Sequence, residues 1–464
     1  MNQPSTRSYI SMSSNFTILA LFALDMLGIV LIFNINHWLV VGHLADTVLL
    51  TWKLIIVAGF TFLYFYLMDL YTFESPLSQL GMLERSFIAV VLTGITTSIT
   101  VYILGPAFIG GFVGRGVLTS SLIMVWLWSL VSRYLLNHWL KQQRGRIGWL
   151  VIADKDMGSF VQDFRSQYKY EQLLVLTPPN QSIDESQATL AGTWDDLDRV
   201  LTENKITGII VGAPDHLPEE LVDRLMRIRI KGLRIYRLSD FYEQYLARLP
   251  VFHLNQTWIA MAHGFELIHN PIGLRFKRYV DILIALLAGV VLLPVLLAVT
   301  LAICFSMGRP ILYRQIRTGE NGTEFTVVKF RTMVTGAEDD GAQYTAADDA
   351  RVTSTGRLLR KFRLDELPQL WNVLKGDMSF IGPRPERPEF IADLQRRIPY
   401  YNLRHVVKPG ITGWAQVMYG YADSEEDAVE KLQYDLFYIK NYSLILDISI
   451  MVKSLKVILF GTGR

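Results

Sequence analysis

The stretch "VDILIALLAGVVLLPVLLAVTLAICFSM", residues 280–307, decides the fold class of this chain. As one straight helix it would be about 42 Å long, more than the roughly 30 Å of a bilayer's hydrocarbon core. Pro294 lies near its middle, where a proline removes a backbone hydrogen bond and kinks a helix. Both flanks are basic, with Arg275, Lys277 and Arg278 before the run and Arg309, Arg314 and Arg317 after it.

A helix that crossed the membrane here would carry one basic cluster to the outside, against the positive-inside rule. A re-entrant helix over residues 278–308, which enters and leaves on one face, keeps both clusters in the cytoplasm. An ordinary kinked span is the alternative, because membrane helices tolerate proline. The flanking charges favour the re-entrant helix.

Four further apolar runs lie upstream, at residues 17–41, 46–68, 86–109 and 117–136. Each is long enough to cross a bilayer as a helix, so we expect residues 1–144 to form a four-helix transmembrane bundle. Asp25 interrupts the first run, and a structural interhelical hydrogen bond is favoured over an ion pathway. The basic stretch "KQQRGR", residues 141–146, follows the fourth run and indicates a cytoplasmic location for what comes next.

The composition supports a membrane protein and excludes several functions. Of 464 residues, 51% are hydrophobic and 19% charged, and the mean hydropathy of +0.26 is too apolar for an ordinary soluble enzyme. The net charge of +2, without a basic stripe, argues against a nucleic-acid partner. The single cysteine, Cys304, excludes an intrachain disulfide and a cysteine-clustered metal site. The first apolar run does not have the pattern of a cleavable signal peptide.

Residues 145–265 predict a Rossmann-like α/β domain. The runs "IGWLVIA", "QLLVLT" and "ITGIIVGAP" are typical of buried parallel strands, and helical patterns separate them. The turn after the first strand, "ADKDMG", has one glycine and two acids, so we expect no dinucleotide site. Such a domain without its cofactor loop suggests regulation or self-association, and we expect a homodimer.

The stretch "RLDELPQLWNVLKGDMSFIGPRPE", residues 363–386, carries the candidate chemistry. Asp365 and Glu366 are adjacent acids, and Arg384 stands between two prolines that restrict its backbone. A carboxylate can act as a nucleophile towards phosphorus if nearby cations neutralise the phosphate oxygens. Mg²⁺ needs only one or two carboxylates besides substrate phosphates, and Asp365 and Glu366 are its candidate ligands.

The ordered motifs "KRYVDILIALL", "VVKFRTM", "RLDELPQLWNVLKGDMSFIGPRPE" and "VKPGITGWAQV" resemble those of the bacterial sugar transferase family, the monotopic phosphoglycosyl transferases. The resemblance covers residues 275–464, and we expect residues 266–464 to form an α-rich catalytic domain with the re-entrant helix. The preceding spans and α/β domain resemble the large membrane-anchored branch, which makes polyprenyl-diphosphate-linked hexoses for exopolysaccharide or O-antigen.

The resemblance implies a role for each matching residue. Asp365 is the nucleophile towards a nucleotide-diphosphate sugar, with UDP as the suggested nucleotide, and Glu366 is its partner. Polyprenyl (undecaprenyl) phosphate is the acceptor in the lipid bilayer of the inner membrane, with the catalytic domain on the cytoplasmic face. Phosphate binding is implied for Arg331, Arg360 and Arg384, and membrane-interface anchoring for Lys277, Arg278 and Pro294. The chain departs from the family at Arg363, where a small residue is common.

Two other functions and one local alternative stay open at this point. A non-catalytic scaffold or sensor of polysaccharide assembly would leave the acid pair unused. A nucleotide-sugar dehydratase or epimerase would need the glycine turn and a Tyr-x-x-x-Lys pair, neither of which follows the first strand. The apolar segment 443–460 fits either a helix lying on the membrane surface or a helix buried in the domain core.

Overall fold

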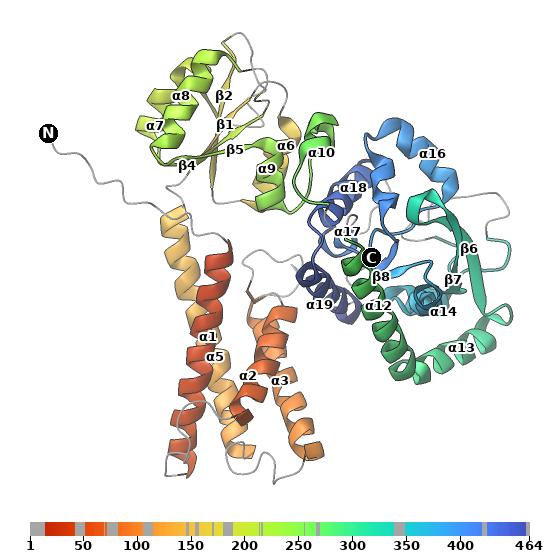
Figure 1. Ribbon diagram of the computed structural model, residues 1–464. Helices are drawn as coiled ribbons and strands as arrows, with labels where there is room; N and C mark the ends of the chain where they lie inside the picture. Colours follow the sequence, from red (N-terminus) through yellow and green to blue (C-terminus); the bar gives the residue numbers. More distant parts are fainter. Residues whose placement is uncertain are drawn as a thin grey trace. The chain divides into compact units, whose positions relative to one another are not determined.

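The computed structural model describes residues 14–41, 52–68, 70–71, 82–104, 115–144, 148–153, 157–168, 171–179, 189–212, 214, 217–254, 256–265, 270–337, 349–419 and 425–460. The chain divides into two compact units, Met1–Arg237 and Leu238–Arg464. Figure 1 labels the helices and strands of both units.

The apolar runs of the first unit form long helices. These are α1 (Ser14–Val41), α2 (Trp52–Leu67), α3 (Met82–Leu104) and α5 (Arg115–Arg144), drawn in red to light orange in Figure 1. Three stretches are long and apolar enough to cross a membrane: Ile18–Val40, Met82–Ile103 and Gly116–Leu136. Leu54–Leu67 of α2 is apolar but shorter, and residues 46–51 of the predicted second run lie outside the described residues. Three of the four predicted spans are therefore confirmed by length and composition.

A buried ion pair joins α1 to α5. The Arg133 guanidinium donates to both carboxylate oxygens of Asp25, at 3.0 and 2.8 Å, and both side chains are 2% exposed. Arg133 Nε also donates to the carbonyl oxygen of Leu70, just beyond α2, and the guanidinium lies 5.0 Å from the centre of the Phe65 ring. Asp25 thus has the structural interhelical role that its sequence context predicts.

The rest of the first unit is built on a parallel sheet. Its strands are β1 (Gly148–Ile152), β2 (Gln172–Thr177), β3 (Thr189–Thr193), β4 (Ile206–Val211) and β5 (Arg234–Arg237), in the order β3-β2-β1-β4-β5. Every paired strand is parallel, as the apolar runs predict. The helices α6 (Gly158–Gln167), α7 (Leu197–Glu203) and α8 (Glu219–Ile230) accompany it. Residues 154–156 of the predicted cofactor turn lie outside the described residues.

The second unit mixes helices with two pairs of short strands. It contains α9 (Leu238–Phe241), α10 (Gln256–Met261), α12 (Pro271–Val291), α13 (Leu293–Met307), β6 (Leu312–Thr318), β7 (Glu324–Phe330), α14 (Ser354–Lys361), α15 (Leu370–Lys375), β8 (Ser379–Ile381), α16 (Pro388–Arg397), β9 (Gly410–Thr412), α17 (Trp414–Met418), α18 (Glu425–Lys440) and α19 (Leu444–Phe460). β6 and β7 pair antiparallel, and β8 and β9 pair parallel. Helices dominate, as expected, but the unit is a mixed α/β domain.

The boundary between the units differs from the expected one at residue 265. Leu249, Val251 and Leu254 are buried in one apolar core with Ile381 and Leu436 of the second unit. Residues 238–265 therefore belong to the second unit and not to the sheet domain, because their apolar side chains are buried there.

The apolar run of residues 280–307 forms a bent pair of helices, α12 and α13, drawn in green and teal in Figure 1. The two axes differ by 62°, and the break is at Leu292. Pro294 lies in the first turn of α13, where it leaves no helical hydrogen bond unmade. The predicted kink is therefore confirmed, and it lies at Leu292, two residues before Pro294.

The C-terminal helix α19 packs on the second unit along one side. Ile450 is fully buried in the core, and Ser454 shares a hydrogen bond of 2.6 Å with Thr412. Leu444 and Ile448 are 44% and 56% exposed. Core packing therefore accounts for one side of this segment, and contact of the other side with a membrane stays a prediction.

We expect Asp25→Leu to destabilise the helical region by about 3–5 kcal/mol, because Arg133 would keep a buried charge without its counter-ion. The double variant Asp25→Leu with Arg133→Met should recover most of that loss. Thermal unfolding of the purified protein in detergent measures both. If the double variant were as unstable as the sum of the two single variants, the pair would not be energetically coupled.

Candidate active site

The acid pair lies in a short helix that the local sequence builds between two others. Thr353 accepts a hydrogen bond from Gly356 N at the start of α14, which ends at Lys361. Arg363 then adopts a left-handed backbone conformation, with φ of 56°, and turns the chain into the 3₁₀-helix η6 (Leu364–Gln369). This conformation costs a residue with a Cβ atom about 1 kcal/mol, so the backbone at position 363 favours glycine.

The side chain of Asn372 attaches the segment that carries the acid pair to strand β7. The side-chain oxygen of Asn372 accepts from Val328 N at 3.1 Å, and its nitrogen donates to the Thr326 carbonyl oxygen at 2.7 Å. Asn372 is 2% exposed and lies in α15, directly after η6. It satisfies two backbone groups at the edge of β7 as a neighbouring strand would, so the acid pair is held close to β7.

Glu366 is neutralised by three cations. Its Oε1 atom accepts from Arg384 at 2.8 Å and from Lys329 at 3.3 Å, and lies 3.7 Å from a guanidinium nitrogen of Arg363. Burial opposes its ionisation, since Glu366 is 6% exposed. The three cations outweigh that burial and hold the pKa of Glu366 well below its ordinary value. Glu366 is therefore a fixed negative charge.

Asp365 has the opposite environment although it is the adjacent residue. Burial raises the pKa of Asp365, and the negative charge of Glu366 raises it further. The cations Lys329, Arg360 and Arg363 act in the other direction. Asp365 is 8% exposed, and its Oδ1 atom has no hydrogen-bond partner among the described residues. Because the two acids are pushed apart in pKa, the pair offers one ion-paired and one unsatisfied carboxylate.

Lys329 of β7 is a site residue that the sequence analysis did not single out. Burial lowers the pKa of Lys329 to about 8, while the charge of Glu366 opposes this shift. The sequence signal that could have identified it is a lysine within an apolar strand, in the quoted motif "VVKFRTM". A lysine with a pKa near neutrality carries a charge that pH can remove.

Arg384 is presented by a loop that the backbone and a second arginine hold. Gly382 N donates to the Thr412 carbonyl oxygen, and Gly410 N donates to the Pro383 carbonyl oxygen, both at 2.9 Å. A Cβ atom on Gly410 would lie 2.1 Å from Gly382 N, so the close approach requires glycine. This approach fixes the loop between β8 and α16 that carries Arg384.

Arg404 supports the same loop from inside the unit. Its guanidinium donates to the Arg384 carbonyl oxygen at 3.0 Å and to Asp435 at 2.8 Å, and Arg404 and Asp435 are 5% and 1% exposed. Sequence reasoning missed this pair, because 31 positions separate its members. Arg404 and Asp435 hold the backbone that orients the Arg384 side chain.

The other two arginines with an implied phosphate role differ from each other. Arg360 Nε donates to Thr332 Oγ1 at 2.8 Å, and its charge acts on Asp365, so Arg360 belongs to the site. Arg331 instead donates to the carbonyl oxygens of Met307 and Gly308, at 2.6 and 2.8 Å, at the C-terminus of α13. Arg331 thus caps a helix, and its contacts do not support the expected phosphate role.

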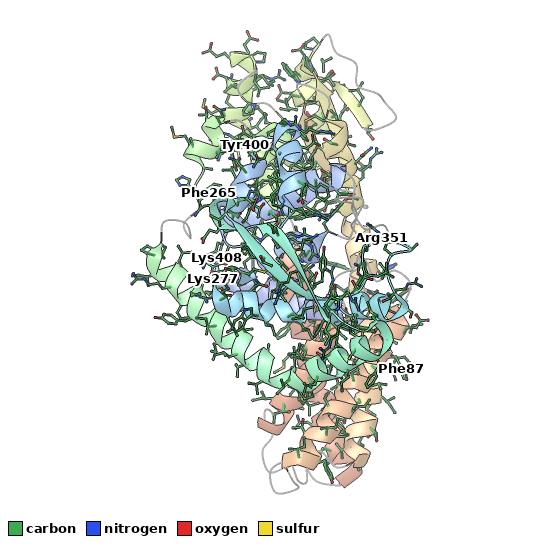
Figure 2. The ribbon with its side chains drawn as sticks, turned by 90° about the vertical axis from the view of Figure 1, so that its right-hand side faces the viewer. Phe87, Phe265, Lys277, Arg351, Tyr400 and Lys408 are labelled. Atoms are coloured by element: carbon green, nitrogen blue, oxygen red, sulfur yellow. The ribbon has the colours of Figure 1, made fainter. Side chains whose placement is uncertain are left out.

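Lys277 and Arg278 bind groups of the second unit. Lys277 Nζ donates to Asp447 at 2.8 Å and is 13% exposed, and Figure 2 labels it on α12. Arg278 donates to the carbonyl oxygens of Val373 and Leu374 at the end of α15. These side chains hold α12 to the domain, and headgroup anchoring by the two residues stays a prediction. Pro294 marks the start of the bent helix α13, as described above.

The side chains of this site would supply only some of the ligands that a divalent cation needs. No cluster of three or more His, Cys, Asp or Glu side chains that could hold a metal occurs within the described ranges. Mg²⁺ binds through one or two carboxylates when substrate phosphates complete its shell. The unsatisfied Oδ1 of Asp365, next to Glu366, is compatible with such a ligand set.

We expect the two acids to respond to neutralisation in opposite directions. Asp365→Asn should raise the stability at neutral pH by about 0.5–2 kcal/mol, because burial and the charge of Glu366 both oppose a negative charge there and raise the pKa of Asp365. Glu366→Gln should lower it by about 3–5 kcal/mol, because three half-buried cations lose the buried counter-ion that they share. Thermal unfolding of the two variants, measured in parallel, compares them. Destabilisation of equal size in both would contradict the difference in environment.

Known proteins are similar to the part of the chain that contains this site. The profile of the family described as "Bacterial sugar transferase" matches residues 272–461. A UDP-N-acetylgalactosamine-undecaprenyl-phosphate N-acetylgalactosaminephosphotransferase of Aeromonas hydrophila is 40% identical over 249 residues, which cover 54% of this chain and 58% of that relative. A UDP-glucose:undecaprenyl-phosphate glucose-1-phosphate transferase of Caulobacter vibrioides is 39% identical over 200 residues, covering 42% of this chain and 74% of that relative.

A third relative is matched over most of its length. This protein of Bacillus subtilis, named as a sugar transferase, is 41% identical over 173 residues, which cover 36% of this chain and 80% of the relative. The match to the Aeromonas hydrophila protein covers a smaller share of that relative, 58% of its length. The family profile falls on the unit that contains the acid pair, and the Bacillus subtilis relative is covered over 80% of its length. The chain therefore belongs to the bacterial sugar transferase family.

Proposed function

We propose that this protein transfers a hexose-1-phosphate from a UDP-sugar to undecaprenyl phosphate and so initiates an exopolysaccharide or O-antigen. The names of the relatives support the donor and acceptor classes. One feature of the site carries the proposal: a buried Asp365 with an unsatisfied oxygen, beside a Glu366 that cations already neutralise. Of the two acids, Asp365 is therefore the one available to react with phosphorus.

In the first step, a carboxylate oxygen of Asp365 attacks the β-phosphorus of the nucleotide sugar. The bond from this phosphorus to the oxygen that bridges it to the α-phosphate breaks, and the nucleoside monophosphate leaves with the electron pair. In the second step, an oxygen of polyprenyl phosphate attacks the same phosphorus, and the bond to Asp365 breaks. The carboxylate is restored, so the protein turns over.

The surrounding cations have distinct tasks in this reaction. Arg360 and Lys329 lie beside Asp365 and would neutralise the phosphate oxygens that approach it. Arg384 donates to Glu366 and would bind an oxygen of the diphosphate. Asp365 and Glu366 would hold Mg²⁺ with the substrate phosphates, and the bound ion would further screen their charge.

The attachment of α12 and α13 supports a re-entrant membrane helix. Arg278 and Lys277 tie the start of α12 to α15 and α19, and Arg331 ties the end of α13 to β7. Both ends of the bent pair are thus bound to one compact unit, whereas a spanning helix would have its ends on opposite faces. A hairpin of this kind would keep Asp365 at the cytoplasmic face of the inner membrane, within reach of the lipid phosphate and the nucleotide sugar.

The first unit completes the proposed architecture. The apolar helices would form a four-helix transmembrane bundle, with three candidate spans and the shorter α2. The strand order β3-β2-β1-β4-β5 supports a Rossmann-like domain after them.

We expect a hexose-phosphate adduct on the peptide that holds Asp365 when the protein meets its nucleotide sugar and Mg²⁺ without polyprenyl phosphate. Peptide mass spectrometry with a panel of UDP-sugars detects the adduct and identifies the sugar. Asp365→Asn should abolish it, because an amide is not a nucleophile here. Asp377→Asn, an acid outside the pair, should keep it. Product formation without any adduct would indicate direct transfer in a ternary complex and refute the covalent step.

The pKa of Lys329 predicts a pH dependence. Its folded pKa is lowered to about 8, so the lysine is charged below that pH and becomes neutral above it. We expect kcat/KM for the nucleotide sugar to fall about tenfold per pH unit above pH 8, because a phosphate-binding charge is lost. Lys329→Arg should move this limb to higher pH. An unchanged alkaline limb in Lys329→Arg would assign it to another group.

A further inference from the structure

Arg317 of β6 lies on the face of the β6–β7 hairpin that carries Lys329. Antiparallel pairing sets Tyr313 opposite Lys329, and Arg317 follows Tyr313 by four positions on the same strand. Cross-strand partners and alternate residues of one strand point to the same face. Burial is the main cause of the lowered pKa of Lys329, and the nearby charge of Arg317 contributes to it. Arg317 is therefore a cation close to the candidate active site.

The side chain of Arg317 reaches the loop between β8 and α16. Its Nη1 atom donates to the Pro385 carbonyl oxygen at 3.2 Å, and its Nε and Nη2 atoms donate to Gln315 Oε1 at 3.0 and 2.6 Å. The backbone approaches the same loop, since Thr318 N donates to the Glu386 carbonyl oxygen at 2.9 Å. These side-chain bonds use three of the five donors of the guanidinium. One hydrogen on each terminal nitrogen of Arg317 has no acceptor within the described ranges.

Arg317, Arg384 and Arg387 form a group of like charges at this loop, which we call the loop arginines. Burial lowers the pKa of Arg317, and the charges of Arg384 and Arg387 lower it further. Glu386 opposes this shift, but its carboxylate lies 3.8 Å from Arg317 and 3.9 Å from Arg404, so one acid is shared by two cations. Like charges held this close favour the binding of an anion.

Lys329 connects the loop arginines with the acid pair. The charge of Asp365 and that of Arg317 both act on Lys329. A diphosphate whose β-phosphorus meets Asp365 has its α-phosphate one bridging oxygen away. Both phosphates are charged, so the α-phosphate requires a second group of cations next to those that surround Asp365. The loop arginines fit this position.

We propose that Arg317 is a further donor-binding residue, which holds the α-phosphate of the nucleotide sugar together with Arg384 and Arg387. The two remaining hydrogens on its terminal nitrogens suit the oxygens of one phosphate. Negative charge develops on the α-phosphate as the bond between the β-phosphorus and the bridging oxygen breaks, and the loop arginines stabilise this charge. This role rests on the proposed function at Asp365, and it gives the leaving nucleoside monophosphate its own binding residues.

Binding of UMP to the full chain in lipid nanodiscs tests this role, because the single phosphate of UMP is the α-phosphate of the donor. In isothermal titration calorimetry, we expect Arg317→Met to weaken UMP binding about 10- to 100-fold through the loss of charged hydrogen bonds. Arg317→Lys keeps the charge without the fork of donors and should lose less. Arg314→Met is the matched control, since Arg314 is exposed on the opposite face of the same strand. Unchanged UMP affinity in Arg317→Met would overturn the role.

Two further ligands identify the phosphate that Arg317 binds. Weaker binding of UDP but not of UMP in Arg317→Met would place Arg317 at the β-phosphate. Weaker binding of a short-chain polyprenyl phosphate but not of UMP would place it at the acceptor. Either result contradicts the proposal. UMP binding needs no turnover, so absence of the adduct at Asp365 in the unaltered protein would refute the covalent step and leave this test intact.

A variant with the opposite effect on charge separates phosphate binding from support of the loop. Glu386→Gln removes a negative charge 3.8 Å from Arg317 and keeps the backbone carbonyl that accepts from Thr318 N. We expect this variant to bind UMP about two- to fivefold more tightly, because the loop arginines are then less neutralised. An arginine that only holds the loop predicts no such gain. Unchanged or weaker UMP binding in Glu386→Gln would refute the anion site.

Discussion

The neutralisation of Glu366 is the interaction on which the site depends. Arg384, Lys329 and Arg363 come from three separate segments and converge on one carboxylate oxygen. A buried glutamate without these partners would take up a proton, and the three half-buried cations without the glutamate would repel one another. Their mutual neutralisation leaves the neighbouring Asp365 as the acid with unsatisfied hydrogen-bonding capacity, and this asymmetry makes nucleophilic chemistry possible at the pair.

The same unit uses its remaining arginines to hold backbone. Arg278 caps α15, Arg331 caps α13, and Arg404 holds the loop of Arg384. The guanidinium suits this task because its fork of donors can satisfy several carbonyl oxygens at once. The bent pair α12 and α13 is thereby secured at both ends to the domain that carries the acids. The bent helix pair is therefore mechanically linked to the acid pair within the second unit.

Buried polar interactions have different roles in the two units. In the first unit, the Asp25–Arg133 pair joins α1 to α5, and hydrogen bonds from Asn36 to Ser121 and from Trp128 to the Leu24 carbonyl oxygen join the same two helices. In the second unit, polar networks are placed at the acid pair and around α12, where Asp281 accepts from Ser379 and from Phe380 N. Each buried charge discussed here is matched by a partner from a distant segment, except at Asp365, whose Oδ1 has none among the described residues.

The sequence by itself determined the apolar helices, the parallel strands, the kink near Pro294 and the acid pair, because each depends on residues that are neighbours along the chain. It also placed Arg360 and Arg384 near the acids, through the spacing of the motifs. Only the tertiary structure decided that Lys329 reaches Glu366, that Arg404 pairs with Asp435, and which oxygens of the second unit Arg331, Lys277 and Arg278 bind. The reason is physical: a basic side chain is several ångströms long and flexible, and its partner is chosen by whichever buried oxygen the fold brings within reach.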